Sequence, residues 1–289
     1  MISGIYSLSC AAKIASIPIH MAYKILFSDI DGTLLNAERD LSELTVSEIS
    51  RIREQVPVIL VSARMPKQMY HLQDKLGIRN TPLICYNGAL VLVDDNPIHS
   101  TEIPLNAIKQ IVDFNENNPD GKFHINLFNT NSWYVEAYDY WAQREENNTK
   151  ISPEIKSNRQ VIKEWEAIQK GAHKITCMGD AALIEKAYRY FKEHLGEDLH
   201  LYRSKDTYIE IANKQVSKLT GIQKLLAHFN ILLEEAIAFG DNYNDTEMIA
   251  AVGHGVAVAN ARDEVKAVAK AITVHHKEDG VAQYIRKVF

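Results

Sequence analysis

The chain has 289 residues, about twice the length of a typical domain, and its apolar and charged fractions of 46% and 24% suit a protein with a sizeable core. Its net charge of −5 argues against a dedicated nucleic-acid binder, and no segment reaches the ~18 apolar residues of a membrane-spanning helix. Three widely spaced cysteines, Cys10, Cys85 and Cys177, form neither a disulfide framework nor a zinc pattern, which is typical of reduced thiols in a cytoplasmic protein.

The first twenty residues do not share the pattern of the rest. The segment 2–19 is the most apolar, but Lys13, Pro18 and several serines interrupt it, and it lacks the basic start of a secretory signal. We expect residues 1–20 to be an extension, or an upstream start, outside the fold. A short amphipathic helix that touches a membrane is the alternative.

From Lys24 onward, short apolar runs alternate with segments of helical spacing. The pattern predicts strands at 24–30, 57–61 and 81–86, with helices at 42–55 and 66–76. Strands that alternate with helices at this rhythm pair in parallel through right-handed crossovers. The sequence therefore predicts an α/β fold with a doubly wound, Rossmann-like parallel sheet.

The same rhythm returns near the end of the chain, with a helix at 217–229, a strand at 236–240, a helix at 245–251 and strands at 255–259 and 271–274. The middle portion instead has alternating, half-exposed strands at 124–128, 132–135, 174–178 and 208–211, and a long helix at 181–194. We therefore expect a core domain of residues 21–88 and 213–289 and an inserted α+β domain of residues 89–212. Asn87-Gly88 and residues 212–215 are the expected crossing points, the first of them a hinge.

Four acidic residues follow two of the predicted buried strands. Asp29 and Asp31 are two positions apart, so their side chains point to the same side, and Asp241 and Asp245 follow a later strand. Open α/β sheets bind ligands outside the carboxyl ends of their strands. Four carboxyl groups there favour a hard cation such as Mg²⁺. A turn-forming Asp-Gly pair and a solvated acidic loop are the alternatives.

Three further positions could face the same crevice. Ser62 ends the second strand, although it could equally cap a helix. Lys218 precedes a helix, where a surface lysine is the ordinary expectation. Gly32 and Thr33 form a tight loop whose successive N–H groups could bind an anion.

These segments resemble the four ordered motifs of the haloacid dehalogenase (HAD) superfamily. The matching segments are Asp29-Ile-Asp-Gly-Thr-Leu-Leu35, Val61-Ser62, Val216-Ser-Lys218 and Gly240-Asp-Asn-Tyr-Asn-Asp245. The chain is similar over residues 22–289 to the Cof-type subfamily, whose large α/β cap (class IIB) is inserted between the second and third motifs. Leu219 and Ala63 stand where the subfamily usually has glycine, which affects local backbone shape rather than a functional group.

The resemblance implies catalytic roles for two residues. Asp29 is the expected nucleophile, which attacks phosphorus to form an aspartyl-phosphate. Asp31 is the expected general acid and base, and crowding by negative charge is expected to raise its pKa.

The resemblance also implies a metal site and a phosphate site. Mg²⁺ is expected on Asp29, the backbone carbonyl of Asp31, and Asp241, with Asp245 supporting these ligands. Phosphate oxygens are expected to bind the following residues: Thr33, Ser62, Lys218 and Asn244.

The expected activity is that of a Mg²⁺-dependent phosphatase of small phosphorylated metabolites such as sugar phosphates, with no nucleic-acid or membrane partner. The inserted domain is expected to close over the site and read the leaving group. A sugar phosphomutase is the alternative within enzymes. A ligand-sensing module with vestigial phosphatase activity is the alternative from another class.

Overall fold

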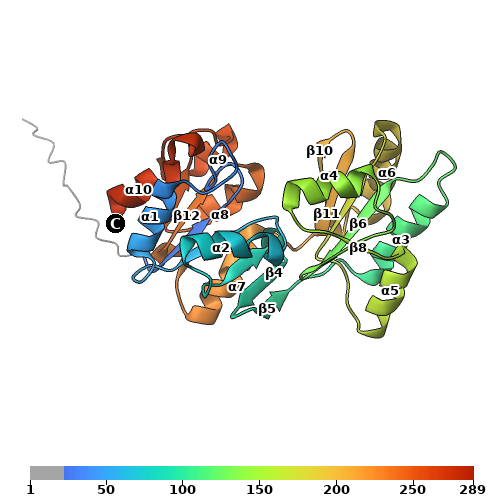
Figure 1. The fold of residues 1–289 in the computed structure, drawn as a ribbon, viewed down its shortest axis with the longest axis horizontal. Coiled ribbons are helices and arrows are strands. Elements are labelled where there is room, and N and C mark those ends of the chain that lie inside the picture. Colours follow the sequence, from blue (N-terminus) through green and yellow to red (C-terminus); the bar gives the residue numbers. More distant parts are fainter. Residues whose placement is uncertain (1–22) are drawn as a thin grey trace, which may run out of the picture.

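The computed structural model of the protein describes residues 23–289, so the extension expected at 1–20 lies outside the described residues. The described chain forms two lobes that lie side by side (Figure 1). We call residues 25–100 and 218–288 the core lobe and residues 105–213 the inserted lobe. Among the described residues, no helix is both long and apolar enough to cross a bilayer.

The core lobe contains an eight-stranded sheet in the order β14-β13-β12-β1-β2-β3-β4-β5. From β14 to β3 all neighbours pair in parallel, and β4 and β5 add an antiparallel edge. The strands span β1 (Ile25–Ser28), β2 (Val58–Val61), β3 (Leu83–Cys85), β4 (Leu90–Val93), β5 (Asn96–Ser100), β12 (Ala236–Gly240), β13 (His254–Ala257) and β14 (Ala271–Ile272). β1, β2, β3 and β12 are buried along their whole length, as expected of strands covered on both faces.

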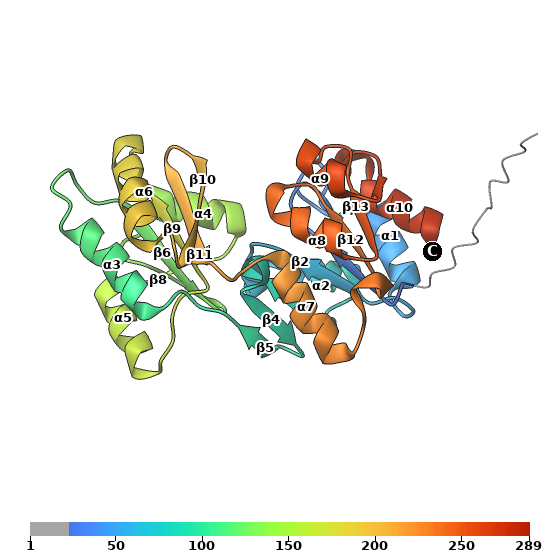
Figure 2. The same ribbon diagram turned by 180° about the vertical axis from the view of Figure 1, so that it is seen from behind.

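Helices cover both faces of this sheet. Contacts between elements place α1, α2 and α10 together on one face and α7, α8 and α9 on the other (Figures 1 and 2). Their bounds are α1 (Glu43–Ile52), α2 (Tyr70–Leu76), α7 (Lys218–Phe229), α8 (Thr246–Ala251), α9 (Asp263–Val268) and α10 (Gly280–Val288). The helix predicted at 66–76 is divided into a 3₁₀ turn, Pro66–Gln68, and α2.

The first end of the inserted segment differs from the prediction. The sequence boundary at residue 89 assigns 90–100 to the inserted domain, but β4 and β5 pair with β3 and extend the core sheet. Asp94 and Asp95, both at positive φ (50° and 59°), form the tight turn between the two strands. We therefore propose that the insertion begins after Ser100, near residues 101–104.

The inserted lobe is a six-stranded mixed sheet with helices on both faces. Its order is β10-β11-β9-β6-β7-β8, antiparallel except for the pair β7 and β8. The elements span α3 (Leu105–Glu116), β6 (His124–Asn129), β7 (Ser132–Val135), α4 (Tyr140–Thr149), β8 (Glu154–Ile155), α5 (Asn158–Ala167), β9 (Lys174–Met178), α6 (Ala181–Leu195), β10 (Leu199–Lys205) and β11 (Tyr208–Asn213). Helices α3, α5 and α6 share a buried apolar cluster with one face of the sheet, whereas α4 packs on the opposite face through Ala142.

The chain crosses twice between the lobes, and the turn between β6 and β7 and side chains at the start of β9 also contact the core lobe. The Asn213 side chain donates to the Glu102 carbonyl (3.0 Å), which joins the outgoing and returning segments. At the turn between β6 and β7, the carbonyl of Thr130 accepts from the Tyr86 hydroxyl (2.7 Å), and Asn131 accepts from the Lys67 amide (2.9 Å). The face of the inserted sheet that carries α4 is thereby held against the carboxyl ends of the core strands.

Candidate active site

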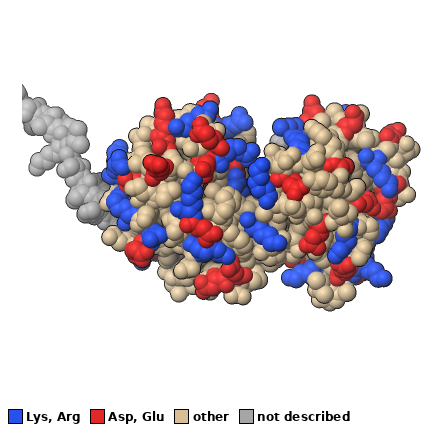
Figure 3. Space-filling view, viewed as in Figure 1, with Lys and Arg blue, Asp and Glu red and all other residues tan. Residues whose placement is uncertain are grey.

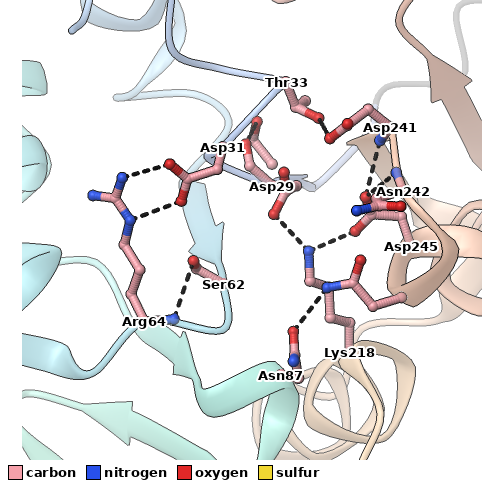
Figure 4. Close-up of polar contacts among 12 residues, drawn as sticks. Asp29, Asp31, Thr33, Ser62, Arg64, Asn87, Lys218, Asp241, Asn242 and Asp245 are labelled. Carbon is pink, nitrogen blue, oxygen red and sulfur yellow. Dashed lines mark hydrogen bonds and ion pairs between the residues drawn. The ribbon is translucent and has the colours of Figure 1, made fainter. Parts of the chain in front are cut away.

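Three neighbouring core strands each place a polar side chain at the same edge. Asp29 follows β1, Ser62 follows β2 and Asp241 follows β12, and these strands are adjacent in the order β12-β1-β2. The Asp29 amide donates to the Phe239 carbonyl (3.0 Å), so the register between β1 and β12 continues into the site. Figure 4 shows these side chains around one centre.

Lys218 is the buried cation of this centre. Its ammonium lies 2.5 Å from Asp29 Oδ1 and 2.6 Å from Asp245 Oδ1, and the side chain is 1% exposed. Burial acts to lower the pKa of Lys218, but the two adjacent carboxylates outweigh burial and raise it above its ordinary value. Lys218 is therefore a permanent charge, and it opens α7 behind the capping residue Ser217.

Asp245 is fixed by hydrogen bonds to both of its carboxylate oxygens. Its Oδ2 accepts the backbone N–H groups of Asp241 and Asn242, each at 2.9 Å, while Oδ1 binds Lys218. The side chain is fully buried. With both oxygens occupied in this way, Asp245 orients Lys218 and the turn that carries Asp241.

Asp29, Asp241 and Asp245 bring carboxylate oxygens within 4.8 Å of one another. Burial, together with the charges of Asp245 and Asp241, raises the pKa of Asp29 well above its ordinary value, and Lys218 opposes that shift. Burial also raises the pKa of Asp241, against the hydrogen bond from Thr33. Carboxylates gathered in this way need a proton or a cation between them, and their hard oxygen atoms suit Mg²⁺. The donor set therefore fits a metal ion.

Close packing behind Asp241 also requires a glycine. Gly32 has a φ of +86°, and a Cβ atom there would lie 2.6 Å from Asp241 Oδ2. Thr33, the next residue, donates its hydroxyl to Asp241 Oδ1 at 2.8 Å and is 1% exposed. The Thr33 hydroxyl thus contacts an expected metal ligand, and phosphate binding by the N–H groups of the Thr33 loop stays a prediction.

Asp31 turns away from the aspartate cluster, contrary to expectation. Arg64 donates to both of its oxygens, at 2.7 and 2.8 Å (Figure 4). The Arg39 guanidinium lies 3.5 Å from Asp31 Oδ1. Burial acts to raise the pKa of Asp31, but the two guanidinium groups hold it below its ordinary value. The expected raised pKa is therefore wrong for this arrangement, because cations rather than carboxylates surround Asp31.

The remaining expected phosphate ligands, Ser62 and Asn244, belong to the core lobe, and Asn244 lines a cavity shared with the inserted lobe. Ser62 is buried, and its hydroxyl accepts the Arg64 N–H (3.2 Å) in a local turn rather than capping a helix. Asn244 donates to Asn87 Oδ1 (2.9 Å), and the Asn87 amide donates to the Ser62 carbonyl (2.8 Å). Asn87, expected as a hinge, is thus held firmly within the core lobe.

Sequence reasoning assigned no site role to Arg39, Arg64 or Asn87. The sequence held a signal for Arg64, which directly follows Ser62-Ala63, and for Asn87, which forms an Asn-Gly pair with Gly88. In the structure Asn87 adopts a φ of +56°. Arg39 lies in the loop before α1, and no spacing links it to Asp31.

Comparison with known proteins gives consistent results. The sequence pattern of the haloacid dehalogenase-like hydrolase family matches residues 26–285. A Haemophilus influenzae protein, named provisionally as a phosphatase, is 31% identical over 93% of this chain and 99% of its own length. A Bacillus subtilis 5-amino-6-(5-phospho-D-ribitylamino)uracil phosphatase is 29% identical over 90% of this chain and 96% of its own. A solved HAD subclass IIB sugar phosphatase superposes with a TM-score of 0.74 at 23% identity, covering 92% of this chain and all of that one.

Proposed function

The chain belongs to the haloacid dehalogenase-like hydrolase family, as a Cof-type member with a class IIB inserted cap, and we propose that it hydrolyses small phosphate monoesters by way of a phosphorylated Asp29. As a HAD-type phosphatase it is a phosphoric monoester hydrolase. The specific ester and the covalent route are the parts we propose.

One observation carries the proposal: a buried lysine bridges two aspartates beside a third. Lys218 holds Asp29 in a single orientation through Oδ1, and Asp241 lies within 4.8 Å of that carboxylate. A fixed carboxylate at the carboxyl end of β1 suits nucleophilic attack, because little reorganisation is needed during the reaction.

The first step forms one bond and breaks another. An Asp29 oxygen attacks phosphorus, and the bond from phosphorus to the ester oxygen of the leaving group breaks. That oxygen takes a proton from Asp31. Because Arg64 and Arg39 favour the ionised form of Asp31, this carboxylate must first exchange its contact with Arg64 for a contact with the substrate and take up a proton from solvent.

The second step reverses the proton transfer. Water attacks the phosphorus of the aspartyl-phosphate, gives its proton to Asp31 and releases inorganic phosphate and the free Asp29 carboxylate. Lys218, Ser62 and Asn244 are the proposed contacts for the phosphate oxygens, whose charge is greatest in the transition state.

A bound Mg²⁺, held by Asp29, the Asp31 carbonyl and Asp241, would reduce the repulsion between the anionic nucleophile and the phosphate. Asp245 and Thr33 position that site, since they bind the Asp241 backbone and side chain respectively.

The inserted cap limits the size of the substrate. It lies over the two cavities that contain Asp31 and Asn244, so a small metabolite fits more readily than a folded phosphoprotein. Sugar phosphates are the class we propose, and the uracil derivative hydrolysed by the Bacillus subtilis relative shows another small phosphate ester handled by this fold.

The test replaces the nucleophile with its isostere. Asp29→Asn keeps the shape and removes the attacking charge, so release of phosphate from p-nitrophenyl phosphate with Mg²⁺ should fall at least about 1,000-fold. Asp40→Asn, at an exposed ion pair with Lys75, is the matched control and should stay within about twofold. An unchanged rate for Asp29→Asn would rule out the covalent route.

A further inference from the structure

A cavity of about 230 Å³ lies beside Asp31 and spans both lobes. The residues that line it are all polar except Ala63: Asp31, Arg39, Ala63, Arg64 and Gln68 of the core lobe, and Glu145, Asn148, Thr149 and Lys174 of the inserted cap. A cavity of this size, smaller than those that take drug-sized ligands, suits a small polyol or sugar acid.

The position of Asp31 assigns this cavity to the leaving group, a step that rests on the proposed function. The proton donor must lie within hydrogen-bond reach of the ester oxygen that departs. Asp31 lines this cavity, whereas the neighbouring cavity of about 420 Å³, lined by Asn87, Tyr208 and Asn244, does not include it. The group attached to the departing oxygen therefore extends along Arg64 and Lys174.

The walls of this cavity carry more positive than negative charge. They include three cationic side chains, those of Arg39, Arg64 and Lys174, and two carboxylates, those of Asp31 and Glu145. Arg39 and Arg64 share one of these carboxylates, because both contact Asp31. This local excess is opposite in sign to the net charge of −5, and lysine and arginine side chains are visible on both sides of the crevice between the lobes (Figure 3).

Lys174 supplies the least neutralised charge. Its ammonium donates to the Ala63 carbonyl (3.0 Å) and lies over the Phe128 ring (4.9 Å) and the Tyr86 ring (5.7 Å). No carboxylate of residues 23–289 forms an ion pair with it. A carbonyl and two rings orient a cation without cancelling its charge, so this ammonium can attract an anion.

We propose that the cavity binds a second anionic group, a carboxylate or a phosphate, on the leaving group of the substrate, with Lys174 and Arg39 as its cationic contacts. The substrates are thereby narrowed from phosphate monoesters in general to those of sugar acids or sugar bisphosphates. Glu145, Asn148 and Thr149 provide hydrogen-bonding groups for the hydroxyls that lie between the two anionic ends.

The experiment compares substrates with and without a second anionic group, and the first pair is also matched in size. Gluconate 6-phosphate and glucitol 6-phosphate differ only in a carboxylate against a hydroxymethyl group, and fructose 1,6-bisphosphate and fructose 6-phosphate test a phosphate in the same role. We expect kcat/KM to favour an anionic member at least about tenfold, the scale of one charge-assisted hydrogen bond. A preference within the gluconate and glucitol pair indicates that the cavity binds a carboxylate, and a preference within the fructose pair indicates that it binds a phosphate.

Two variants test the assigned cations. Lys174→Met and Arg39→Gln should each lower the ratio of kcat/KM for the anionic against the neutral substrate at least about fivefold. Arg39 is largely exposed, so its replacement tests the proposal even if Lys174→Met fails to fold. Lys109→Met, at an exposed ion pair on α3, is the control and should keep the wild-type ratio.

Equal kcat/KM for both members of each pair in the wild-type enzyme would overturn this inference. An equal loss on both members in Lys174→Met would also contradict it, because Lys174 would then serve only to join the lobes. If p-nitrophenyl phosphate is still hydrolysed in an Asp29-dependent manner, these failures leave the proposed function intact.

Discussion

Thr33 orients the side chain of Asp241. Its hydroxyl is buried and donates to Asp241 Oδ1 at 2.8 Å, so it fixes which oxygen of the carboxylate remains free. Replacing a group that orients a metal ligand without touching the metal lowers metal affinity by roughly 10–100-fold. Thr33 should therefore act through metal binding rather than through phosphate.

Replacing Thr33 with valine keeps the shape and removes the donated hydrogen bond. After removal of metal with EDTA, the Mg²⁺ concentration that restores half of the activity should rise at least about tenfold in Thr33→Val. Thr81→Val, whose hydroxyl donates to the Ile78 carbonyl outside the site, should restore at the wild-type concentration. A rise in KM for the phosphate ester at saturating Mg²⁺, with no change in Mg²⁺ dependence, would instead support the phosphate-binding role.

The sequence pattern predicts that the buried side chains of the site lie close together, but it does not predict which residues surround Asp31. Asp29, Asp241, Asp245 and Lys218 come together because each directly follows a core strand or opens a helix beside one. The orientation of Asp31 depends on Arg39 and Arg64, which reach it from loops whose paths no periodicity predicts. A pKa inferred from spacing between acidic residues fails where the cations come from elsewhere.

At the scale of elements, α7 approaches the core sheet unusually closely. A Cβ atom on Gly221 would lie 2.7 Å from Ile84 Cγ2 and 2.8 Å from the Gly88 Cα. Gly88, at a φ of +99°, faces the Ser217 carbonyl and Gly221 in return. Two glycines thus let the start of α7 lie against the sheet, where Lys218 can reach Asp29.

Gly221→Ala should destabilise the protein although alanine is the better helix former. The helix propensity gain is about 1 kcal/mol, but overpacking against a backbone atom costs about 1–3 kcal/mol, so we expect a net loss of roughly 1 kcal/mol in the free energy of unfolding. Urea denaturation measures this change. Gln223→Ala, on the exposed face of the same helix, should shift stability by less than about 0.5 kcal/mol, and an increase in stability for Gly221→Ala would contradict the packing argument.

The elements of the parallel core were largely predictable, and its antiparallel edge was not. Fully buried apolar segments such as β1 and β12 are predicted as strands of a parallel sheet, because short apolar segments that alternate with helices pair in parallel. β4 is a short run of apolar residues and β5 is largely polar, and neither pattern indicates which sheet the strand joins. Assignment of the hairpin to the core therefore required the structure.

At the scale of the whole molecule, His173 lies where the two lobes meet. Its ring stacks on Tyr86 of the core lobe at 5.2 Å, its Nδ1 accepts the Thr130 N–H (3.1 Å), and its Nε2 lies 3.0 Å from the Ser100 hydroxyl. Since Nδ1 is an acceptor, the ring is neutral with its proton on Nε2. Burial lowers the pKa of His173 to about 4. The charge of Glu102 acts to raise this pKa, and the charges of Lys170 and His99 act to lower it further.

This pKa predicts a loss of stability in acid. Between about pH 6.5 and 4 the unfolded chain binds a proton at His173 that the folded protein does not, so stability falls as the pH is lowered, by up to about 3 kcal/mol. His173→Gln should remove that part of the dependence, measured as the difference between variant and wild-type free energies of unfolding from pH 7 to 4.5. The exposed control His228→Gln should keep the wild-type slope, and parallel curves for wild type and His173→Gln would disprove the assignment.

The core lobe is built from two segments of the chain that are separated by the inserted lobe, and this order affects how the protein folds during synthesis. β1, which leads into Asp29, pairs on one side with β2, made shortly afterwards, and on the other with β12, made after more than half of the polypeptide has been translated. On the ribosome the intervening lobe can complete its own sheet while β1 still has an unpaired edge. The nascent chain therefore carries an exposed, strongly apolar strand until translation nears its end, which makes it a natural client for a chaperone that shields such edges.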